Sequence, residues 1–538
     1  MSEPTSRVVV LLWLAVVGAC GPEPRHTGDD CTPPDPACPV CVPHTGTCTG
    51  SESHACNDQG TGYVDTTCDP MQGETCDPNT GECVGLCAPQ NLGSSYIGCE
   101  YFPTVTGNMV SADYHFAVAI ANTTSEVANI IIEGGALTAP ESFTVGPNSV
   151  GVKTLPWQAA LKLCVSNTWA NCLGMQTDAA LAVGGSYHLR SSAPVTVYQF
   201  NPLEYTLPSA IESSFTNDAS LLLPVNVWRS SYYAAAWQQS GGTNPSELAV
   251  TAQFDGTEVT ITSKAATNAA GGAPAFTPGV PQMVTLNKGD VIEITSRTGD
   301  LTGSLVSSSK PVQLISGHYC ANIPDGVAAC DHIEESMFSV DALGRRYIVN
   351  APAVTTIPGG KVEVIRVIAT QANTQLTYDP PQPGAPGAIA AAGDFVEIAD
   401  TAASFMITAD QKILVAQYME GQDAGGNTGD PAMALAVPVE QFRTSYLFHA
   451  PPNYESNYVD VTAPAAASVM LDGSPVTFTP IGTTGYGLAR IYPLTAGPAG
   501  DGNHKISGNG KFGITVYGYG MYTSYWYPGG LDLTDIIQ

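Results

Sequence analysis

Five side chains that can bind a metal ion or transfer a proton lie close together in the sequence: His318, Asp331, His332, Glu334 and Glu335. Two histidines and a carboxylate can hold zinc, or they can act as an acid–base pair. Glu334 and Glu335 are not expected to act as the paired carboxylates of a glycosidase, because neighbouring residues of a strand point to opposite faces of the sheet. The resulting candidate ligand-contact cluster consists of four residues: His318, Asp331, His332 and Glu334.

A structural role for the same segment is the favoured alternative. Cys320 and Cys330 can form a disulfide that closes a short loop, and the polar residues beside it would then bond the loop backbone. Asp218 and Asp430 occupy the corresponding turns elsewhere in the chain without any histidine. A residue type that recurs at one place in a repeat indicates architecture, so we predict no catalytic residue, no metal and no cofactor.

Sequence signatures of common enzymes are missing. The chain contains no G-x-S-x-G, no H-E-x-x-H and no phosphate-binding G-x(4)-G-K-[ST] motif. The segment SGNGKFG at Ser507 lacks both the first glycine and the final Ser or Thr of the phosphate loop. An enzyme is therefore not the expected function.

Aromatic residues form a second candidate contact surface. Tyrosine and tryptophan offer a large contact area with a polar end, which suits sugars and protein partners. The favoured alternative is that aromatics at alternate strand positions fill the sandwich cores. In the segment YWYPGG, Tyr525 and Tyr527 share one strand face and Trp526 the other, so we expect part of the set to be exposed. The full set is Tyr232, Tyr233, Trp237, Tyr517, Tyr519, Tyr522, Tyr525, Trp526 and Tyr527.

These residues must be positioned by a repeated element. One strand-like pattern recurs at spacings of 117, 101 and 101 residues: VTVYQF from Val195, VQLISG from Val312, ILVAQY from Ile413 and ITVYGY from Ile514. After each of the first three copies come an acidic turn, a Pro or Ser, and a tyrosine eight residues later: Pro224 to Tyr232, Ser339 to Tyr347 and Pro438 to Tyr446. A fixed period indicates one structural unit copied and stacked.

The expected fold is all-β, made of tandem or fused β-sandwich-like repeats of about 100 residues. Alternating apolar runs support strands, and Leu155 to Leu163 is the one segment with helical character. The expected repeat units span residues 101–231, 232–346, 347–445 and 446–538. The alternative is a closed, propeller-like ring of four sheets, but propeller blades are about half this long.

Two Asp-Gly pairs predict tight hairpins, because both turn positions favour a positive φ in this dipeptide. They are Asp255-Gly256, followed by TEVTIT, and Asp472-Gly473, followed by SPVTF. Each pair should therefore connect two strands that are bonded to one another.

Composition limits the partners. The 538 residues include 19 Lys and Arg against 48 Asp and Glu, a net charge of −29. Binding to nucleic acid needs clustered basic residues, so it is not expected. No run after the N-terminus is long and apolar enough to span a membrane.

The N-terminus indicates export. Residues 1–19 combine Arg7 with the apolar stretch from Val8 to Val17, as in a signal peptide. Cys20 follows a small residue, as in the bacterial lipobox, which predicts a lipidated Cys20 and a flexible tether over residues 20–30. The anchor would be the protein's sole attachment to a membrane, at the outer membrane or cell surface. The alternative is ordinary cleavage nearby, with Cys20 discarded.

Cysteine usage supports an oxidising compartment. Of the 15 cysteines, ten fall between Cys31 and Cys99, in a segment poor in aliphatic residues. Such a segment cannot bury a core and must be held by bridges, so residues 31–99 should form a small disulfide-rich module. The remaining candidates are two local pairs, Cys164 with Cys172 and Cys320 with Cys330.

Several phrases in order resemble the N-terminal domain of IgGFc-binding proteins, particularly the bacterial lipoprotein members typical of myxobacteria. They are YQFNP at Tyr198, NDASLLLPV at Asn217, the stretch from Ser316 to Pro352, and VYGYGMYTSYWYPGGLDL at Val516. The resemblance implies an extracellular binding or adhesion module without a cofactor. The expected function is therefore recognition of an extracellular protein or glycan. A secreted hydrolase and a structural envelope component are the alternatives.

Overall fold

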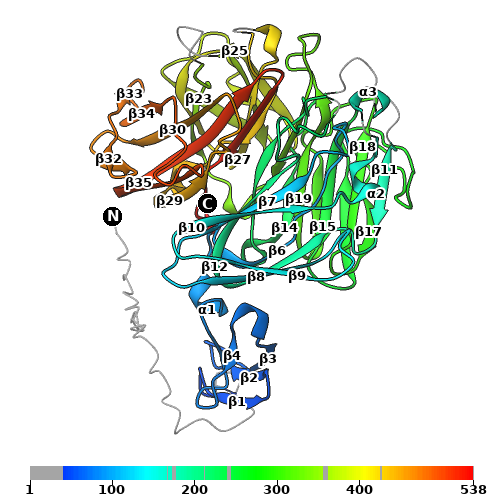
Figure 1. Cartoon of the computed structure of the whole chain (residues 1–538), viewed down its shortest axis with the longest axis vertical. Helices are drawn as coiled ribbons and strands as arrows, with labels where there is room; N and C mark the ends of the chain where they lie inside the picture. The colour runs from blue at the N-terminus through cyan, green and yellow to red at the C-terminus, as the bar shows by residue number, and fades with distance from the viewer. Residues whose placement is uncertain are drawn as a thin grey trace, which may run out of the picture. The chain divides into compact units, whose positions relative to one another are not determined.

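The computed structural model describes residues 40–166, 168–172, 177–210, 212–238, 244–354, 361–424 and 427–536. The predicted signal peptide, Cys20, the tether, Cys31 and Cys38 lie outside the described residues. The chain forms two compact units, one of residues 1–68 and 76–83 and one of residues 69–75 and 84–538. The expected all-β class is confirmed (Figure 1). Among the described residues, no helix is long and apolar enough to cross a membrane.

The small unit is held by disulfides. Its three strands, β1 (Gly46–Thr49), β2 (Glu52–Cys56) and β3 (Tyr63–Thr67), form one antiparallel sheet. Every residue of β3 is exposed, so the sheet has no apolar face to bury. Bridges replace that core, as expected for a segment of this composition: Cys41–Cys56, Cys48–Cys76 and Cys68–Cys83.

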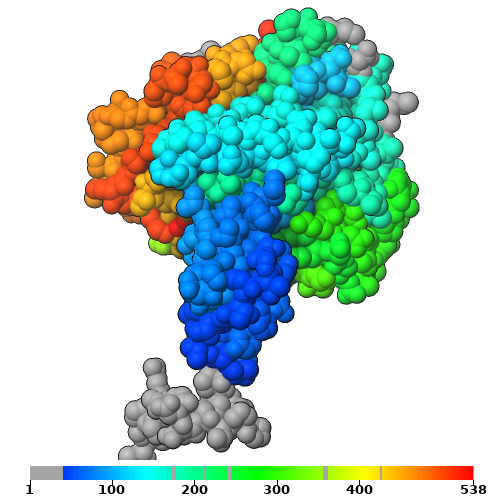
Figure 2. All heavy atoms as spheres, turned by 60° about the horizontal axis from the view of Figure 1, so that its bottom comes forward, coloured from blue at the N-terminus to red at the C-terminus, as the bar shows by residue number. Residues whose placement is uncertain are grey.

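The large unit begins with a seven-stranded sheet. Its strands are β6 (Gly98–Tyr101), β7 (Phe116–Asn122), β8 (Ala128–Gly134), β9 (Glu141–Val145), β10 (Ser149–Leu155), β12 (Tyr187–Phe200) and β13 (Ala219–Leu222). In the space-filling view this first sheet (cyan) spreads over one face, between green residues of the second sheet and orange residues of the last (Figure 2). The expected helix is reduced to one turn, α2 (Ala159–Lys162).

The second sheet has eight strands: β11 (Ala179–Ala182), β14 (Arg229–Tyr233), β15 (Ser246–Ala252), β16 (Thr257–Thr262), β17 (Gln282–Leu286), β18 (Val291–Ser296), β19 (Leu305–Ala321) and β20 (Asp331–Ser336). Strand β11 precedes β12 in the chain, yet it pairs with β18. The first two repeats are therefore fused through a shared strand, which fits the expected fused sandwiches.

The remaining strands form two four-stranded sheets and a final eight-stranded sheet. The first pair contains β21 (Arg346–Asn350), β22 (Glu363–Ala369), β23 (Thr374–Asp379), β24 (Ala388–Ile389), β25 (Phe395–Thr401), β26 (Ser404–Ala409), β27 (Ile413–Met419) and β28 (Met433–Leu435). The last contains β29 (Arg443–His449), β30 (Ser456–Pro464), β31 (Val469–Leu471), β32 (Ser474–Pro475), β33 (Thr479–Pro480), β34 (Tyr486–Ile491), β35 (Asn503–Gly520) and β36 (Thr523–Pro528).

The recurring sequence pattern marks one strand in each repeat. It occupies the second half of the long strands β12, β19 and β35, and in the third repeat it is β27, which follows β26 after a short break. In β19, residues 305–308 pair with β16, and residues 312–318 pair with β15. One strand thus joins both layers of its sandwich, and the sheet curls around it (Figure 1).

Alternate residues of strand β22 pack into two different hydrophobic cores. In β22, Ile365 and Val367 pack into the interior of the third repeat, whereas Val364 and Ile368 pack into a core shared between repeats. All seven residues of β22 are buried as a result. The alternation seen in the sequence therefore separates two apolar environments, rather than a core from solvent.

The four repeats meet at their last strands. Strand β13 contacts β20 and β36, and β28 also contacts both β20 and β36, so the four strands close a ring. In the first three repeats the acidic residue singled out in the sequence lies just before this strand or at its first residue: Asp218, Asp331 and Asp430.

Candidate binding site where four loops meet

Four loops gather at one end of this ring. Each joins the patterned strand of a repeat to the last strand of the same repeat: 201–218 between β12 and β13, 322–330 between β19 and β20, 420–432 between β27 and β28, and 521–522 between β35 and β36. Because the last strands contact one another, their preceding loops lie at the same rim. We name these four segments the rim loops.

Hydrogen bonds tie the rim loops together. The Asp430 N–H donates to Ser524 Oγ at 2.9 Å, and the Ser524 N–H donates to Asp331 Oδ2 at 3.3 Å. The Glu334 N–H donates to Asp218 Oδ2 at 2.8 Å. All three aspartates are fully buried, and burial raises the pKa of each. The recurring acidic turns are therefore joints between repeats.

A pocket of about 280 Å³ opens between the rim loops. Every repeat contributes to its lining: Met109, Phe215 and Thr216 from the first, Cys320, Ala329 and Cys330 from the second, Asp430 from the third and Tyr522 from the last. Most of this lining is apolar, and Asp430 is the charged residue among the lining residues. Pockets with apolar walls and a few fixed polar groups are typical ligand sites.

Two aromatic walls of the pocket have strained backbones. Phe215 and Tyr522 both have a φ of 58°, in the left-handed region that bulky side chains seldom adopt. Their rings meet edge to face with centroids 6.2 Å apart, and Tyr522 is 41% exposed. Strain of this kind concentrates at functional sites, where the surrounding structure maintains it.

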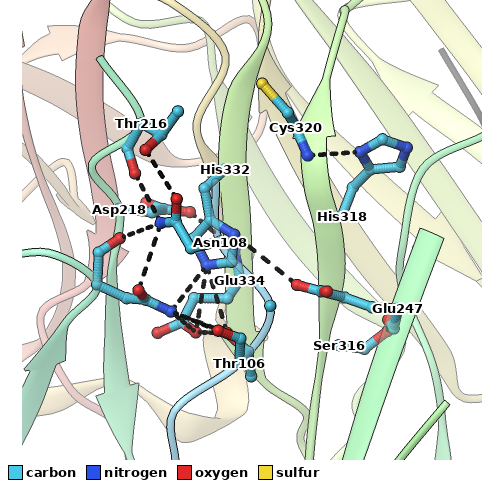
Figure 3. Close-up of polar contacts among 12 residues, drawn as sticks. Thr106, Asn108, Thr216, Asp218, Glu247, Ser316, His318, Cys320, His332 and Glu334 are labelled. Atoms are coloured by element: carbon cyan, nitrogen blue, oxygen red, sulfur yellow. Dashed lines mark hydrogen bonds and ion pairs between the residues drawn. The ribbon is translucent and has the colours of Figure 1, made fainter. Parts of the chain in front are cut away.

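The ligand-contact cluster expected from the sequence lies beneath the pocket, not in it. His318, Asp331, His332 and Glu334 are all fully buried. Figure 3 shows His318, His332 and Glu334 with their polar contacts. Glu334 accepts hydrogen bonds from Thr106 Oγ1, from Gln199 Nε2 at 2.7 Å and from Ser220 Oγ at 3.2 Å.

His332 connects this network to a second pair of acids. Its Nε2 lies 3.4 Å from Glu334 Oε2, and its Nδ1 lies 3.8 Å from Glu247 Oε1. Burial, and to a smaller extent repulsion by neighbouring carboxylates, raise the pKa of both Glu247 and Glu293 well above the usual value. Burial also acts to raise the pKa of Glu334, but hydrogen bonds and the charge of His332 outweigh it and lower that pKa.

His318 behaves as a neutral core residue. Its Nδ1 accepts the Cys320 N–H at 3.0 Å, and burial lowers its pKa to about 3. Glu335 points away from Glu334, as expected for neighbouring strand residues, and burial raises its pKa well above the usual value. In the part of the chain that the structure describes, no group of three His, Cys, Asp or Glu could hold a metal ion.

Both local cysteine pairs are bridged. Cys164 bonds Cys172, and Cys320 bonds Cys330. The second bridge lines the pocket and joins the two ends of rim loop 322–330.

The segment YWYPGG follows the favoured interpretation, in which strand aromatics fill a core, and the expectation that part of this segment is exposed was wrong. Tyr525, Trp526 and Tyr527 are all fully buried, because β36 lies between β35 and the other central strands. The exposed member of the set is Tyr522, in the turn before β36.

Met109 and Phe215 were not anticipated from the sequence, because no local pattern distinguishes them. Asp430 was recognised only as a recurring turn residue. The loop position itself was the available signal, since each rim loop follows a copy of the repeated strand.

Comparison with known proteins identifies a family. The family model described as IgGFc binding protein matches residues 218–518, which cover most of the second sheet, both four-stranded sheets and most of the last sheet. Over 317 residues the chain is 26% identical to the human IgGFc-binding protein, a match that covers 58% of this chain and 6% of the human protein. Because the family model matches more than half of its residues, the chain belongs to the IgGFc-binding protein family.

Proposed function

We propose that this chain is an extracellular binding protein that holds a protein or glycan ligand at the rim loops, without catalysis. The main observation behind this proposal is that four loops, one from each repeat and far apart in the sequence, line the same pocket. A rigid β scaffold with functional loops at one end is a common design for recognition. The family supports an extracellular binding role in general.

The immunoglobulin Fc part belongs to the name of the human relative, and the match covers a small part of that protein. A protein ligand is favoured over a glycan, because the exposed part of the pocket wall is apolar rather than rich in hydrogen-bonding groups. Fc therefore enters the proposal as one ligand to be tested among other extracellular proteins.

The test compares the chain with a variant whose pocket wall is removed. Purified protein is screened against immobilised extracellular glycoproteins, Fc and polysaccharides, and any ligand found is titrated against Phe215→Ala/Tyr522→Ala. Affinity should fall at least tenfold, because buried aromatic anchors carry much of the binding energy. The matched control is Phe254→Ala, which removes an aromatic ring of similar exposure outside the rim. Equal affinity of both variants for the ligand would place binding elsewhere and refute the proposal.

We further propose anchoring through a lipidated Cys20, at the outer membrane or cell surface. Its support is the lipobox-like sequence before Cys20 and the disulfide-rich unit, which requires an oxidising compartment. Mass spectrometry of the mature N-terminus checks this, and an unmodified residue there would refute it.

A further inference from the structure

The pocket between the rim loops holds one polar group that the fold leaves incompletely satisfied. Asp430 is fully buried and lines the pocket. Its Oδ1 accepts the Gln422 N–H at 3.2 Å, whereas its Oδ2 has no hydrogen-bond partner among the described residues. A buried carboxylate oxygen without a donor costs free energy, so a ligand that supplies one would gain from it.

The nearest buried cation does not neutralise this carboxylate by direct contact. Lys361 Nζ donates to the carbonyl groups of Thr428 at 3.2 Å and Gly429 at 3.3 Å. Burial raises the pKa of Asp430 to about 6, and the charge of Lys361 lowers it part of the way back. The carboxyl group is therefore ionised above neutral pH and can accept a charged donor.

The surrounding charge favours a cation. By sequence, the four rim loops contain no Lys or Arg, whereas besides the buried Asp218, Glu420 and Asp430 they carry four acids: Glu204, Glu212, Asp325 and Asp423. Complementary charge both attracts a basic partner and excludes an acidic one.

The size and walls of the pocket narrow the ligand further. A volume of about 280 Å³ lies just below the range that holds drug-sized molecules. It suits a single long side chain with an apolar stem, which would lie along Met109 and the Cys320–Cys330 bridge. Lysine and arginine have such stems and place their charge at the end.

We propose that the pocket takes one Lys or Arg side chain of a protein partner, with its stem against the Phe215 and Tyr522 wall and its charged head on Asp430. This inference rests on the proposed binding function and names the chemistry of the partner. A cation near aromatic rings gains further attraction.

The experiment uses small probes, so that it does not depend on finding the partner. N-acetyl-lysine methylamide and N-acetyl-arginine methylamide are compared with their neutral analogues, N-acetyl-norleucine and N-acetyl-citrulline methylamide. Binding to the full chain at pH 8 is measured by saturation-transfer NMR on the probe signals. We expect the cationic probes to bind at least tenfold more tightly, as for a charge-assisted hydrogen bond.

Two variants separate the pocket from the general acidic surface. Asp430→Asn keeps the acceptor for Gln422 and should remove the preference for cations. The matched control, Asp423→Asn, removes an exposed charge from the same rim loop and should keep the preference. Equal binding of cationic and neutral probes, or equal effects of the two substitutions, would overturn the inference.

A salt titration of the unmodified chain provides a test that does not require the Asp430→Asn variant to fold. A buried contact should retain the cation preference at about 0.5 M salt, whereas attraction by exposed charges is largely screened. Loss of the preference at this salt concentration would also overturn the inference. If a partner binds the rim loops through a side chain other than Lys or Arg, this inference is refuted but the proposed binding function is not.

Discussion

At the scale of single residues, the pocket depends on two side chains in unfavourable backbone conformations. Phe215 and Tyr522 hold a left-handed φ at a cost of order 1–2 kcal/mol each. A glycine at either position would relieve this cost but would remove a wall of the pocket. An aromatic residue at each position is therefore consistent with a ring that serves binding rather than stability.

Comparing Tyr522→Gly with Tyr522→Ala separates the effect of backbone strain on stability from the effect of losing the aromatic ring. Both variants lose the contact with Phe215, but only glycine adopts a φ of 58° freely. Tyr522→Gly should therefore be more stable than Tyr522→Ala by about 1 kcal/mol, measured by thermal or urea unfolding. A Tyr522→Ala variant as stable as Tyr522→Gly would contradict strain at this position.

At the scale of elements, a repeated tyrosine joins each repeat's entry strand to its long strand. Tyr347 is representative: its hydroxyl accepts the Gly344 N–H at 3.0 Å and donates to the Ile413 carbonyl at 2.6 Å. Tyr101 and Tyr446 make the same two kinds of contact, and Tyr232 makes the first.

The Pro or Ser eight residues before three of these tyrosines has a structural reason. Pro224, Ser339 and Pro438 each precede a 3-10 turn: η2 (Val225–Val227), η3 (Val340–Ala342) and η5 (Val439–Gln441). The spacing seen in the sequence therefore records one connection, in which a single helical turn leads into the tyrosine strand.

Removing one of these hydroxyls should destabilise the large unit. Tyr347→Phe leaves the Gly344 N–H and the Ile413 carbonyl without their partner in the core, at a cost of about 1–3 kcal/mol. Thermal unfolding should show a lower midpoint. Tyr492→Phe, at an exposed tyrosine, is the control and should leave the midpoint unchanged. Equal midpoints for Tyr347→Phe and the unmodified chain would show that water replaces the lost contact.

The two Asp-Gly turns show which hairpins a dipeptide preference can predict and which it cannot. Asp472-Gly473 has a positive φ at both residues and joins the bonded strands β31 and β32, so this hairpin prediction is confirmed. The prediction for Asp255-Gly256 was wrong, because β15 and β16 do not pair with each other; both pair with β19. The turn crosses between the two layers of a sandwich, which a dipeptide preference cannot reveal.

At the scale of the whole molecule, the repeats are joined by buried polar and charged groups as well as by a shared apolar core. Arg366 of the third repeat is almost fully buried. It pairs with Asp300 at 2.8 Å, and its guanidinium carbon lies 3.9 Å from the ring centroid of Trp237; both partners belong to the second repeat. Burial of so many ionisable groups makes stability depend on pH.

Buried carboxyls predict greater stability at mildly acidic pH. Burial raises the pKa of Asp460 and of Glu420 to about 7, and it raises the pKa of other interior carboxyls well above the usual value: Asp218, Glu247, Glu293, Asp331, Glu335 and Glu363. The folded chain then binds more protons than the unfolded chain above pH 4. Its free energy of unfolding falls as pH rises, by up to about 1.4 kcal/mol per pH unit for each group.

The buried basic groups make the free energy of unfolding rise with pH, but they are fewer than the buried carboxyls. Burial lowers the pKa of Lys162 to about 7 and that of His318 to about 3, so each favours folding at higher pH. We therefore expect a thermal midpoint several degrees higher at pH 5.5 than at pH 8. Asp460→Asn should reduce this difference. A thermal midpoint that is lower at pH 5.5 than at pH 8 would contradict the prediction that the interior carboxyls are protonated.

The sequence by itself determined the all-β class, the repeat length, the patterned strand and the two local cysteine pairs. These features depend on period-two alternation, turn chemistry and short loop closure, which act between neighbouring residues. Only the tertiary structure decided that the last strands close a ring, that YWYPGG is buried on both faces, and that Phe215, Asp430 and Tyr522 share one pocket. The physical reason is that the faces of these strands are covered by other repeats, and packing between segments 100 to 300 residues apart leaves no trace in local periodicity.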